Sequence, residues 1–274
     1  MNKDPLKVLF LTEWYPSTEQ PVAGIFVREY AKAVQLFNNV IVMHPAGYNS
    51  SVKASCHLTD TVEEGIRTIR VWNRWIPLPK TGTIAKISAV IRAVEGLREE
   101  GFYPDLIHAQ VYSAGFLATL VGMRYKIPVV ISEHFTGFTR HTLRKIDVLK
   151  ARFAMSRAQM VLPVSRDLEK HIKAHGIRAR FQVVPNVVNP EIFYPEKARE
   201  AVEDYPKKLL TVCLLDPKKG IPYLLNSVSI LKTKRDDFIL DIVGDGLFRA
   251  KYEELSVELG LRNIVKFHGL KSKF

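Results

Sequence analysis

The sequence predicts an α/β fold with two doubly wound parallel-sheet domains, the second of them incomplete. Short apolar runs of strand length alternate with longer segments of helical period along the chain. The 274 residues exceed what one hydrophobic core usually holds, roughly 250 residues. The alternation breaks once, at four prolines, and then resumes. These are Pro185, Pro190, Pro195 and Pro206.

The first domain is expected to span residues 1–187. Its strands are predicted from apolar runs at 8–12, 40–44, 66–71, 106–108, 129–132, 160–163 and 181–184. Its helices are predicted at 25–37, 85–99, 114–123, 143–156 and 167–175. In the first helix, apolar residues recur at helical spacing, from Phe26 and Tyr30 to Val34 and Phe37. The proline-rich stretch 188–207 is interpreted as a linker, since it is too irregular for a strand or a continuous helix.

The second domain is expected to span residues 208–274 and to be partial. Strands are predicted at 209–214, 238–243 and 264–267, with helices at 221–233 and 247–259 between them. Three strands and two helices make half of a doubly wound domain.

The composition is that of a globular protein with a substantial core, 47% hydrophobic and 25% charged. No apolar run approaches the ~18 residues that a membrane-spanning helix needs. Cys56 and Cys213 each stand alone, which suggests neither a disulfide framework nor a zinc site. We therefore expect a cytoplasmic protein.

The formal net charge of +12 indicates an anionic partner, which could be nucleic acid, a lipid headgroup or a phosphorylated substrate. Residues 138–157 carry six cations against one acid, Asp147. The cations are Arg140, Arg144, Lys145, Lys150, Arg152 and Arg157. This pattern is typical of a solvated helix face, and also of a patch that faces a membrane or a phosphate. Nucleic acid is not expected as a partner, because no aromatic platform or known module accompanies the charge.

In the second domain, chemistry is expected where strands turn into helices. Lys218, Lys219 and Gly220 stand at such a turn, where free N–H groups and a cation attract phosphate. A basic surface turn gives the same pattern. Gly244 and Asp245 follow the next strand, and they suit either close approach to a ligand or an ordinary turn.

In the first domain, Gly24 precedes the first helix, where it either receives phosphate or simply caps the helix. Glu133 and His134 end a strand. A histidine there can donate to a sugar hydroxyl, with the carboxylate orienting it, although a structural role is the alternative. His108, which ends another strand, leaves the same two choices.

No metal or cofactor site is predicted. His171 and His175 have the spacing of two metal ligands on a helix, but no nearby carboxylate completes a set. No Asp-x-Asp pair, GxGxxG fingerprint or P-loop occurs in the sequence. Any sugar-nucleotide chemistry is therefore expected to be metal-independent.

Several ordered segments resemble family 4 glycosyltransferases, whose two Rossmann-like domains face a cleft in the GT-B fold. In the second half these are LLDPKKGIPYLLNSV, ILDIVGDGLFRAKYEELSVELGL and IVKFHG. In the first half they are TEWYPSTEQPVAGIFVREYAKAV, PDLIHAQ, VVISEH, VLPVS and VVPNVVNPEIFYP. The resemblance covers nearly the whole chain and is greatest to polysaccharide and teichuronic-acid biosynthesis members.

The resemblance implies transfer of a hexosyl unit from a nucleotide diphosphate sugar with retention of configuration. Lys219, with Lys218 beside it, matches the lysine that contacts the donor pyrophosphate, and Gly24 matches a glycine near the phosphates. Gly244 and Asp245 match the turn that borders the nucleotide.

Within the first domain, the resemblance matches His134 to the histidine near the transferred sugar, beside Glu133, while His108 is assigned to the acceptor side. A leaving phosphate oxygen would help to deprotonate the acceptor, so no enzyme nucleophile is implied.

Three departures stand out. Leu214 occupies the place of an arginine that pairs with the diphosphate, and Val187 replaces a glycine. The Glu-x7-Glu segment of the family does not occur within the 274 residues, so we expect a truncated chain, and whether it is active without that segment is left open.

Two other functions are compatible with the sequence. The chain could be a non-catalytic subunit of a polysaccharide-synthesis assembly, or a sugar-nucleotide epimerase of the same architecture. A glycan or lipid-linked acceptor would place a transferase at the inner face of the cell membrane, with the Arg74–Pro77 loop supplying an aromatic anchor.

Overall fold

The chain divides into two units, Met1–Phe193 and Tyr194–Phe274. The division falls inside the stretch 188–207 that the sequence marks as a linker. The computed structural model describes residues 4–48, 56–73, 81–194 and 206–271. The Arg74–Pro77 loop lies outside these described residues.

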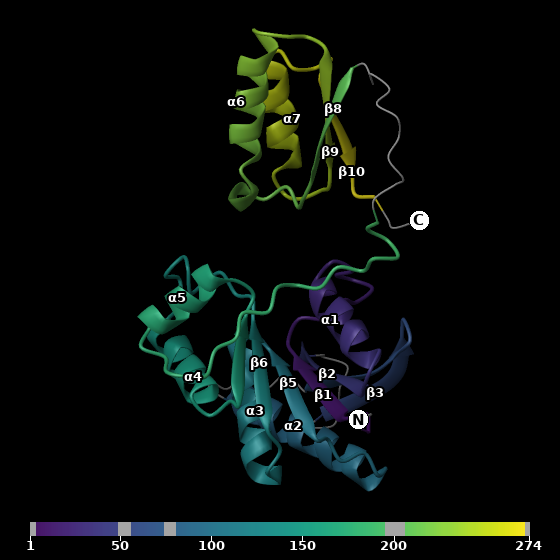
Figure 1. Ribbon diagram of the computed structural model, residues 1–274. Helices are drawn as coiled ribbons and strands as arrows, with labels where there is room; N and C mark the ends of the chain where they lie inside the picture. Colours follow the sequence, from purple (N-terminus) through teal and green to yellow (C-terminus); the bar gives the residue numbers. More distant parts are fainter. Residues whose placement is uncertain (1–3, 49–55, 74–80, 195–205, 272–274) are drawn as a thin grey trace. The chain divides into compact units, whose positions relative to one another are not determined.

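Unit 1 is built on a seven-stranded sheet with the order β3-β4-β2-β1-β5-β6-β7 (Figure 1). Its strands are β1 (Lys7–Thr12), β2 (Asn39–Tyr48), β3 (Cys56–Glu63), β4 (Ile66–Asn73), β5 (Leu106–Gln110), β6 (Val129–Glu133) and β7 (Met160–Pro163). All neighbours pair in parallel except β3 and β4, which form an antiparallel hairpin. The strand order runs outward from β1 in both directions, to β2 and to β5, and in open α/β sheets ligands bind beyond the carboxyl ends of the strands at such a reversal.

Helices cover both faces of this sheet, as the sequence predicts. They are α1 (Ile25–Gln35), α2 (Thr81–Glu99), α3 (Val111–Tyr125), α4 (Lys145–Met155) and α5 (Arg166–Ala174). Alternate residues of β1 belong to two different hydrophobic clusters, one on each face of the sheet. Phe10 packs in one cluster with Val27 of α1, whereas Leu11 packs in another with Val90 of α2 and Leu117 of α3. The continuous apolar run of β1 is therefore buried on both sides.

Two features of unit 1 differ from the prediction. The sequence predicts no strand at 56–63, yet β3 lies there as an exposed edge strand with little apolar signal. The predicted strand 181–184 is wrong. Phe181 forms an isolated bridge with Val161, and the N–H groups of Gln182 and Val184 donate to the carbonyls of Val161 and Pro163. Pro163 has no N–H with which to return a hydrogen bond, so the segment does not become a continuous strand.

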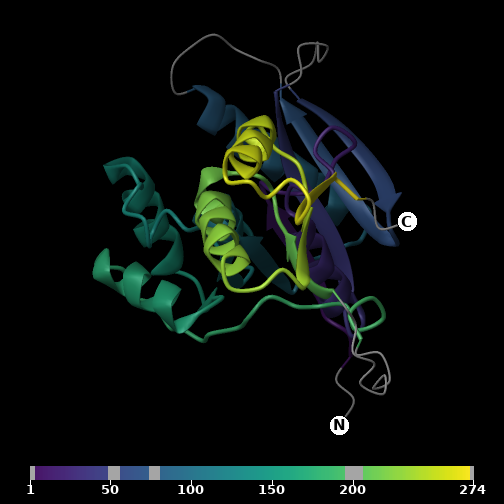
Figure 2. The same ribbon diagram turned by 90° about the horizontal axis from the view of Figure 1, so that it is seen from above.

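Unit 2 contains a parallel three-stranded sheet with the order β10-β9-β8. Its elements are β8 (Lys207–Val212), the short 3-10 helix η1 (Pro217–Lys219), α6 (Ile221–Lys232), β9 (Phe238–Val243), α7 (Arg249–Glu258) and β10 (Val265–Gly269). The two helices lie side by side on one face of the sheet (Figures 1 and 2). Leu240 and Ile242 of β9 are buried with Leu225 and Tyr252 of these helices.

Among the described residues, every helix is too short or too polar to cross a lipid bilayer.

Candidate active site

The parallel strands of unit 1 end at one edge of the sheet, where Glu133 and His134 are located. In the strand register, Gln110 of β5 stands between Thr12 of β1 and Ser132 of β6. Glu133 ends β6 one residue further on, and His134 follows it. The two residues predicted as catalytic therefore lie at the carboxyl edge of the sheet, one strand away from the reversal of strand order at β1 and β5.

The side chain of Glu133 is fully buried and accepts hydrogen bonds from backbone amides. Its Oε1 accepts from the N–H groups of His134 (2.9 Å) and Phe135 (2.8 Å). Its Oε2 accepts from the N–H of Tyr112 (2.8 Å) in the first turn of α3. Burial raises the pKa of the Glu133 carboxyl to about 7, although the three N–H donors act in the opposite direction. Both oxygens are thus occupied in ordering the turn that carries His134.

The imidazole of His134 contacts aromatic rings and the amide of Gln110. Its Nε2 lies 3.0 Å from Oε1 of Gln110, and its ring centre lies 4.7 Å from that of Phe26. Burial lowers the pKa of His134 to about 4, and nearby Asn186 offsets this only in part. At neutral pH the imidazole is therefore uncharged. Its Nδ1 is buried and has no hydrogen-bond partner among the described residues.

His108 lies deeper than His134, in the packed interior. Its side chain is 5% exposed, and its Nε2 lies 2.8 Å from Oγ of Ser132. The ring packs against Phe10 and Tyr30. Burial, with a smaller effect of His134, lowers the pKa of His108 to about 3. A contact between His108 and an acceptor would require this packing to open.

Gly24 closes the loop that leads from β1 to α1. It has φ 67°, and a Cβ atom at this position would lie 2.4 Å from the carbonyl carbon and oxygen of Trp14. The hydroxyl of Thr12 donates to the Trp14 carbonyl (2.8 Å) and accepts from the Trp14 N–H (3.1 Å). The close approach of two backbone segments thus requires glycine here. Its predicted contact with phosphate stays a prediction.

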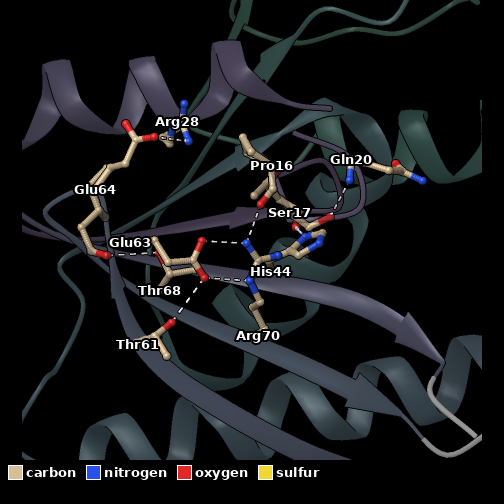
Figure 3. A network of polar contacts seen from close by, with 12 residues as sticks. Pro16, Ser17, Gln20, Arg28, His44, Thr61, Glu63, Glu64, Thr68 and Arg70 are labelled. Carbon is tan, nitrogen blue, oxygen red and sulfur yellow. Dashed lines mark hydrogen bonds and ion pairs between the residues drawn. The ribbon is translucent and has the colours of Figure 1, made fainter. Parts of the chain in front are cut away.

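The same loop is fixed from the β3–β4 side by Arg70 (Figure 3). The guanidinium forms two hydrogen bonds with the carboxylate of Glu63, of 2.8 and 2.7 Å, and donates to the carbonyl of Pro16. His44 donates from Nδ1 to the carbonyl of Thr12, at 2.9 Å. A partly buried, paired arginine holds its partners more rigidly than an exposed lysine would. The hairpin therefore anchors the loop next to the strand ends.

In unit 2, the predicted phosphate turn is a short 3-10 helix followed by α6. The side chain of Asp216 caps it by accepting from the N–H of Lys218 (3.0 Å), and Gly220 has φ 71°. Nζ of Lys218 also lies 3.7 Å from Asp216. Lys219 is exposed and forms no ion pair with any residue that the structure describes. Lys219 is thus the cation of this turn that remains available to an anion.

Gly244 and Gly246 bring two turns of unit 2 together. A Cβ on Gly244 would lie 1.8 Å from the carbonyl oxygen of Cys213, and one on Gly246 would lie 2.6 Å from that of Leu215. Asp245 accepts from the N–H of Gly246 (2.8 Å) and pairs with Arg249. Backbone packing thus accounts for both glycines without a ligand.

The carboxylate of Asp245 lies 3.1 Å from the guanidinium of Arg249. The N–H of Gly246, and then Arg249, lower the pKa of Asp245. Asp245 is therefore an anion already engaged by its neighbours. These interactions do not test the predicted binding of Asp245 to a nucleotide.

His171 and His175 meet a third histidine at the carboxyl end of α5. The ring of His141 lies 5.9 Å from that of His171 and 5.7 Å from that of His175. His171 donates from Nδ1 to the carbonyl of Asp167, at 2.9 Å. Within the described ranges, no three side chains of His, Cys, Asp or Glu are placed to hold a metal ion.

Sequence reasoning missed Gln110, which contacts His134 directly. It ends the apolar strand LIHAQ with a polar side chain that is only 1% exposed. A polar residue at the end of an apolar strand is the signal that the sequence offers for Gln110, as it is for Glu133 and His134. The next residue, Val111, has φ 63°, a left-handed conformation that is strained for a β-branched residue.

Comparisons with known proteins identify the family of both units. A model of the "Glycosyl transferase 4-like domain" matches residues 26–187, more than half of the chain. A model of "Glycosyl transferases group 1" matches residues 193–274. The two matches follow one another in the order of the two units.

A curated relative comes from Bacillus subtilis (strain 168) and bears the name "Putative teichuronic acid biosynthesis glycosyltransferase TuaC". It is 25% identical over 182 residues, which cover 61% of this chain and 46% of that protein. The chain thus spans less than half the length of this curated relative.

Two solved structures show the same fold. Anabaena Alr3699/HepE, in complex with UDP and glucose, has a TM-score of 0.70 at 18% identity, covering 98% of this chain and 70% of that one. Sucrose-phosphate synthase from Thermosynechococcus elongatus has a TM-score of 0.67 at 16% identity, covering 99% and 71%. These likenesses agree with a GT-B fold. Given the two family matches, which together span nearly all of the sequence from residue 26 onward, the chain belongs to the glycosyl transferase 4-like family.

Proposed function

We propose that this protein is a retaining glycosyltransferase that moves a hexosyl unit from a nucleotide diphosphate sugar to a glycan or lipid-linked acceptor. The observation that carries the proposal is the pair of family matches, one to each unit. The teichuronic-acid relative and the UDP-containing Anabaena structure favour a polysaccharide acceptor and a nucleotide-sugar donor. No resident cofactor takes part in this proposal.

For the donor diphosphate, we propose the turn of unit 2 that contains Lys219. Its ammonium is exposed and unpaired among the described residues, and α6 begins two residues later, at Ile221. The first N–H groups of a helix lack intrahelical partners and carry partial positive charge. A phosphate at this point would gain both interactions.

For the reaction, we propose that no side chain attacks the sugar. Glu133 is the buried carboxyl next to His134, but both of its oxygens accept backbone N–H groups. Forming a covalent glycosyl intermediate would break those hydrogen bonds and disrupt the turn. A leaving phosphate oxygen that helps to deprotonate the acceptor needs no such nucleophile.

Donor binding is tested by titration calorimetry of the full chain with UDP. The variant Lys219→Ala should weaken binding by about 10- to 100-fold, the effect of losing one charge-assisted hydrogen bond. Lys234→Ala is the matched control, because Lys234 is also exposed in unit 2 but lies after α6. Equal affinities of Lys219→Ala and the control would contradict the assignment of this turn.

Transfer itself is tested by incubating the full chain with a panel of nucleotide sugars and a polyprenyl diphosphate-linked sugar. The expected result is a lengthened acceptor whose new linkage keeps the anomeric configuration of the donor. Sugar-nucleotide isomerisation without any acceptor would favour an epimerase instead. Absence of both reactions, with a pull-down partner, would favour a non-catalytic subunit.

We further propose peripheral contact with anionic membrane through α4. Ile146 and Leu149 on this helix are 51% and 57% exposed, and the exposed cations Lys145 and Arg152 accompany them. Exposed apolar side chains among cations are typical of interfacial helices.

The test is flotation with phosphatidylserine-containing vesicles at low and high salt. A double variant, Ile146→Ser with Leu149→Ser, should lose binding. The control replaces Leu36 and Phe37, which are 77% and 78% exposed after α1, by serine. If both double variants float as the unaltered chain does, α4 is not the contact.

A further inference from the structure

Gln110 forms a hydrogen bond with His134 whose direction follows from chemistry. The contact joins Oε1 of Gln110 to Nε2 of His134 over 3.0 Å. An amide oxygen only accepts, so the proton of this hydrogen bond lies on Nε2. Burial lowers the pKa of His134 to about 4, so the neutral ring carries one proton at pH 7. With that proton on Nε2, the Nδ1 atom carries a lone pair.

Nδ1 is the atom of this ring that is left for a ligand. It is buried and has no partner at hydrogen-bond geometry among the described residues, although the side chain of Asn186 interacts with the ring and raises its pKa in part. A buried polar atom without a partner is costly in a native protein and indicates a missing one. A hydroxyl group, which can donate, is complementary to this lone pair.

The backbone of Gln110 is fixed in the sheet, and its side chain contacts His134 through Oε1, while its own Nε2 is buried without a hydrogen-bond partner among the described residues. Gln110 is 1% exposed, and its neighbours in the sheet are Thr12 and Ser132. The residue after it, Val111, has φ 63°, a left-handed conformation that is strained for a residue other than glycine. Such strain persists only where the surroundings fix the backbone.

We propose that Gln110 is a positioning residue, which holds His134 in the Nε2-protonated form so that Nδ1 accepts a hydrogen bond from a sugar hydroxyl. This deepens the proposed function, on which the identity of the ligand as a sugar rests. The assignment reverses the sequence expectation, in which His134 donates to the sugar. It also gives Gln110 a role that its isolated position in the sequence does not reveal.

The opposite arrangement makes a distinct prediction. If the amide of Gln110 were rotated by half a turn, its NH₂ group would donate to Nε2. The ring proton would then lie on Nδ1, and His134 would donate to the ligand. The location of one proton therefore decides between the two arrangements.

Nitrogen NMR of the full chain, labelled with ¹⁵N-histidine, measures this location without any substrate. The signals of His134 are assigned by their loss in His134→Asn. At pH 7.5 we expect a protonated Nε2 and an unprotonated Nδ1. A protonated Nδ1 would overturn the proposal, whatever the activity of the protein.

Two variants test whether Gln110 is the cause. Gln110→Leu, of similar size, should reduce the ratio of the two tautomers by roughly fivefold or more, the equilibrium equivalent of one hydrogen bond. Gln110→Glu keeps an acceptor, so Nε2 should stay protonated and the pKa of His134 should rise. His108, whose Nε2 contacts Ser132, should show no change in either variant.

Ser132→Ala is the reciprocal control, since it should alter His108 and leave the tautomer of His134 as it is. An unchanged tautomer ratio in a folded Gln110→Leu variant would exclude the positioning role. In a transfer assay, Gln110→Leu should lower kcat/KM more than Gln110→Glu does. If no sugar is transferred by the unaltered chain, the proposed function fails while the tautomer result still stands.

Discussion

Gly24 approaches Trp14 so closely that a single methyl group would not fit between them. A Cβ at Gly24 would lie 2.4 Å from the carbonyl carbon and oxygen of Trp14, and φ at Gly24 is 67°. We expect Gly24→Ala to displace the loop before α1 and to lower the free energy of unfolding by more than the ~1–2 kcal/mol of a left-handed alanine. Urea unfolding of unit 1 followed by tryptophan fluorescence measures this, because Trp14, Trp72 and Trp75 all belong to that unit.

Gly65→Ala provides the matched control for Gly24→Ala. Gly65 also has a positive φ, 83°, but a Cβ there would meet nothing within 4 Å. The control should therefore show the cost of the backbone conformation alone. If the free energy of unfolding falls by the same amount in the two variants, the contact with Trp14 adds nothing to the cost of alanine at Gly24.

The buried carboxyl of Glu133 should make the stability of unit 1 depend on pH. Its pKa rises from the ordinary 4.5 to about 7 on folding, so the folded state holds a proton that the unfolded state has lost. The stabilising contribution is complete below pH 4.5 and is lost as pH rises to 7, amounting to about 3 kcal/mol. Glu133→Gln does not titrate and should lack this dependence.

The measurement compares urea unfolding of the two proteins between pH 5 and pH 8. His108 and His134 act in the opposite direction, because their lowered pKa values favour the folded state above pH 6.5. They are present in both proteins, so the difference between the proteins isolates Glu133. A pH-independent difference would mean that the three backbone N–H groups keep the carboxylate charged.

The parts of the fold that follow from sequence are those whose apolar pattern is continuous. The run of β1 predicts a strand because helices bury both of its faces, as Phe10 and Leu11 show. The edge strand β3 gives no such signal, because its residues face solvent and only pairing with β4 makes it a strand. At β2, Pro45 suggests an end at His44, yet a bulge between Pro45 and Gly47 lets the strand continue.

Candidate site residues can be predicted from the sequence where they are adjacent, and not where only the fold brings them together. Glu133 and His134 are predicted as site residues because both stand at one strand end. Gln110 was missed because its proposed role depends on contact with His134, which lies 24 positions further along the sequence. Backbone conformation is likewise invisible in the residue types, as the left-handed Val111 and Lys126 show.

Lys126 ends α3 in a conformation that favours glycine. It has φ 56°, it is exposed, and its N–H donates to the carbonyl of Gly122 in a left-handed helix cap. Lys126→Gly should raise the free energy of unfolding of unit 1 by about 0.5–1 kcal/mol, because relief of the Cβ contact outweighs the added entropy of the unfolded chain. Lys126→Ala removes the same charge but keeps Cβ, so it should give no gain in urea unfolding. Equal effects of the two would attribute any change to charge.

Leu214 stands where the resemblance places an arginine that pairs with the donor diphosphate. Its side chain is 47% exposed and it lies shortly before Lys219, so a longer side chain can be accommodated there. Because a guanidinium binds phosphate through two parallel hydrogen bonds, we expect Leu214→Arg to tighten UDP binding by about 10-fold or more. Titration calorimetry at moderate salt measures the change.

Leu210→Arg separates a specific contact from the general effect of charge. Leu210 is 67% exposed on β8, so this variant adds the same charge to unit 2 away from the turn. General attraction between cations and UDP would strengthen binding equally in both variants and would weaken with salt in both. A gain confined to Leu214→Arg, and abolished when Lys219→Ala is added, would mean that both cations act on one phosphate group. Independent, additive effects of the two substitutions would instead assign them to separate interactions.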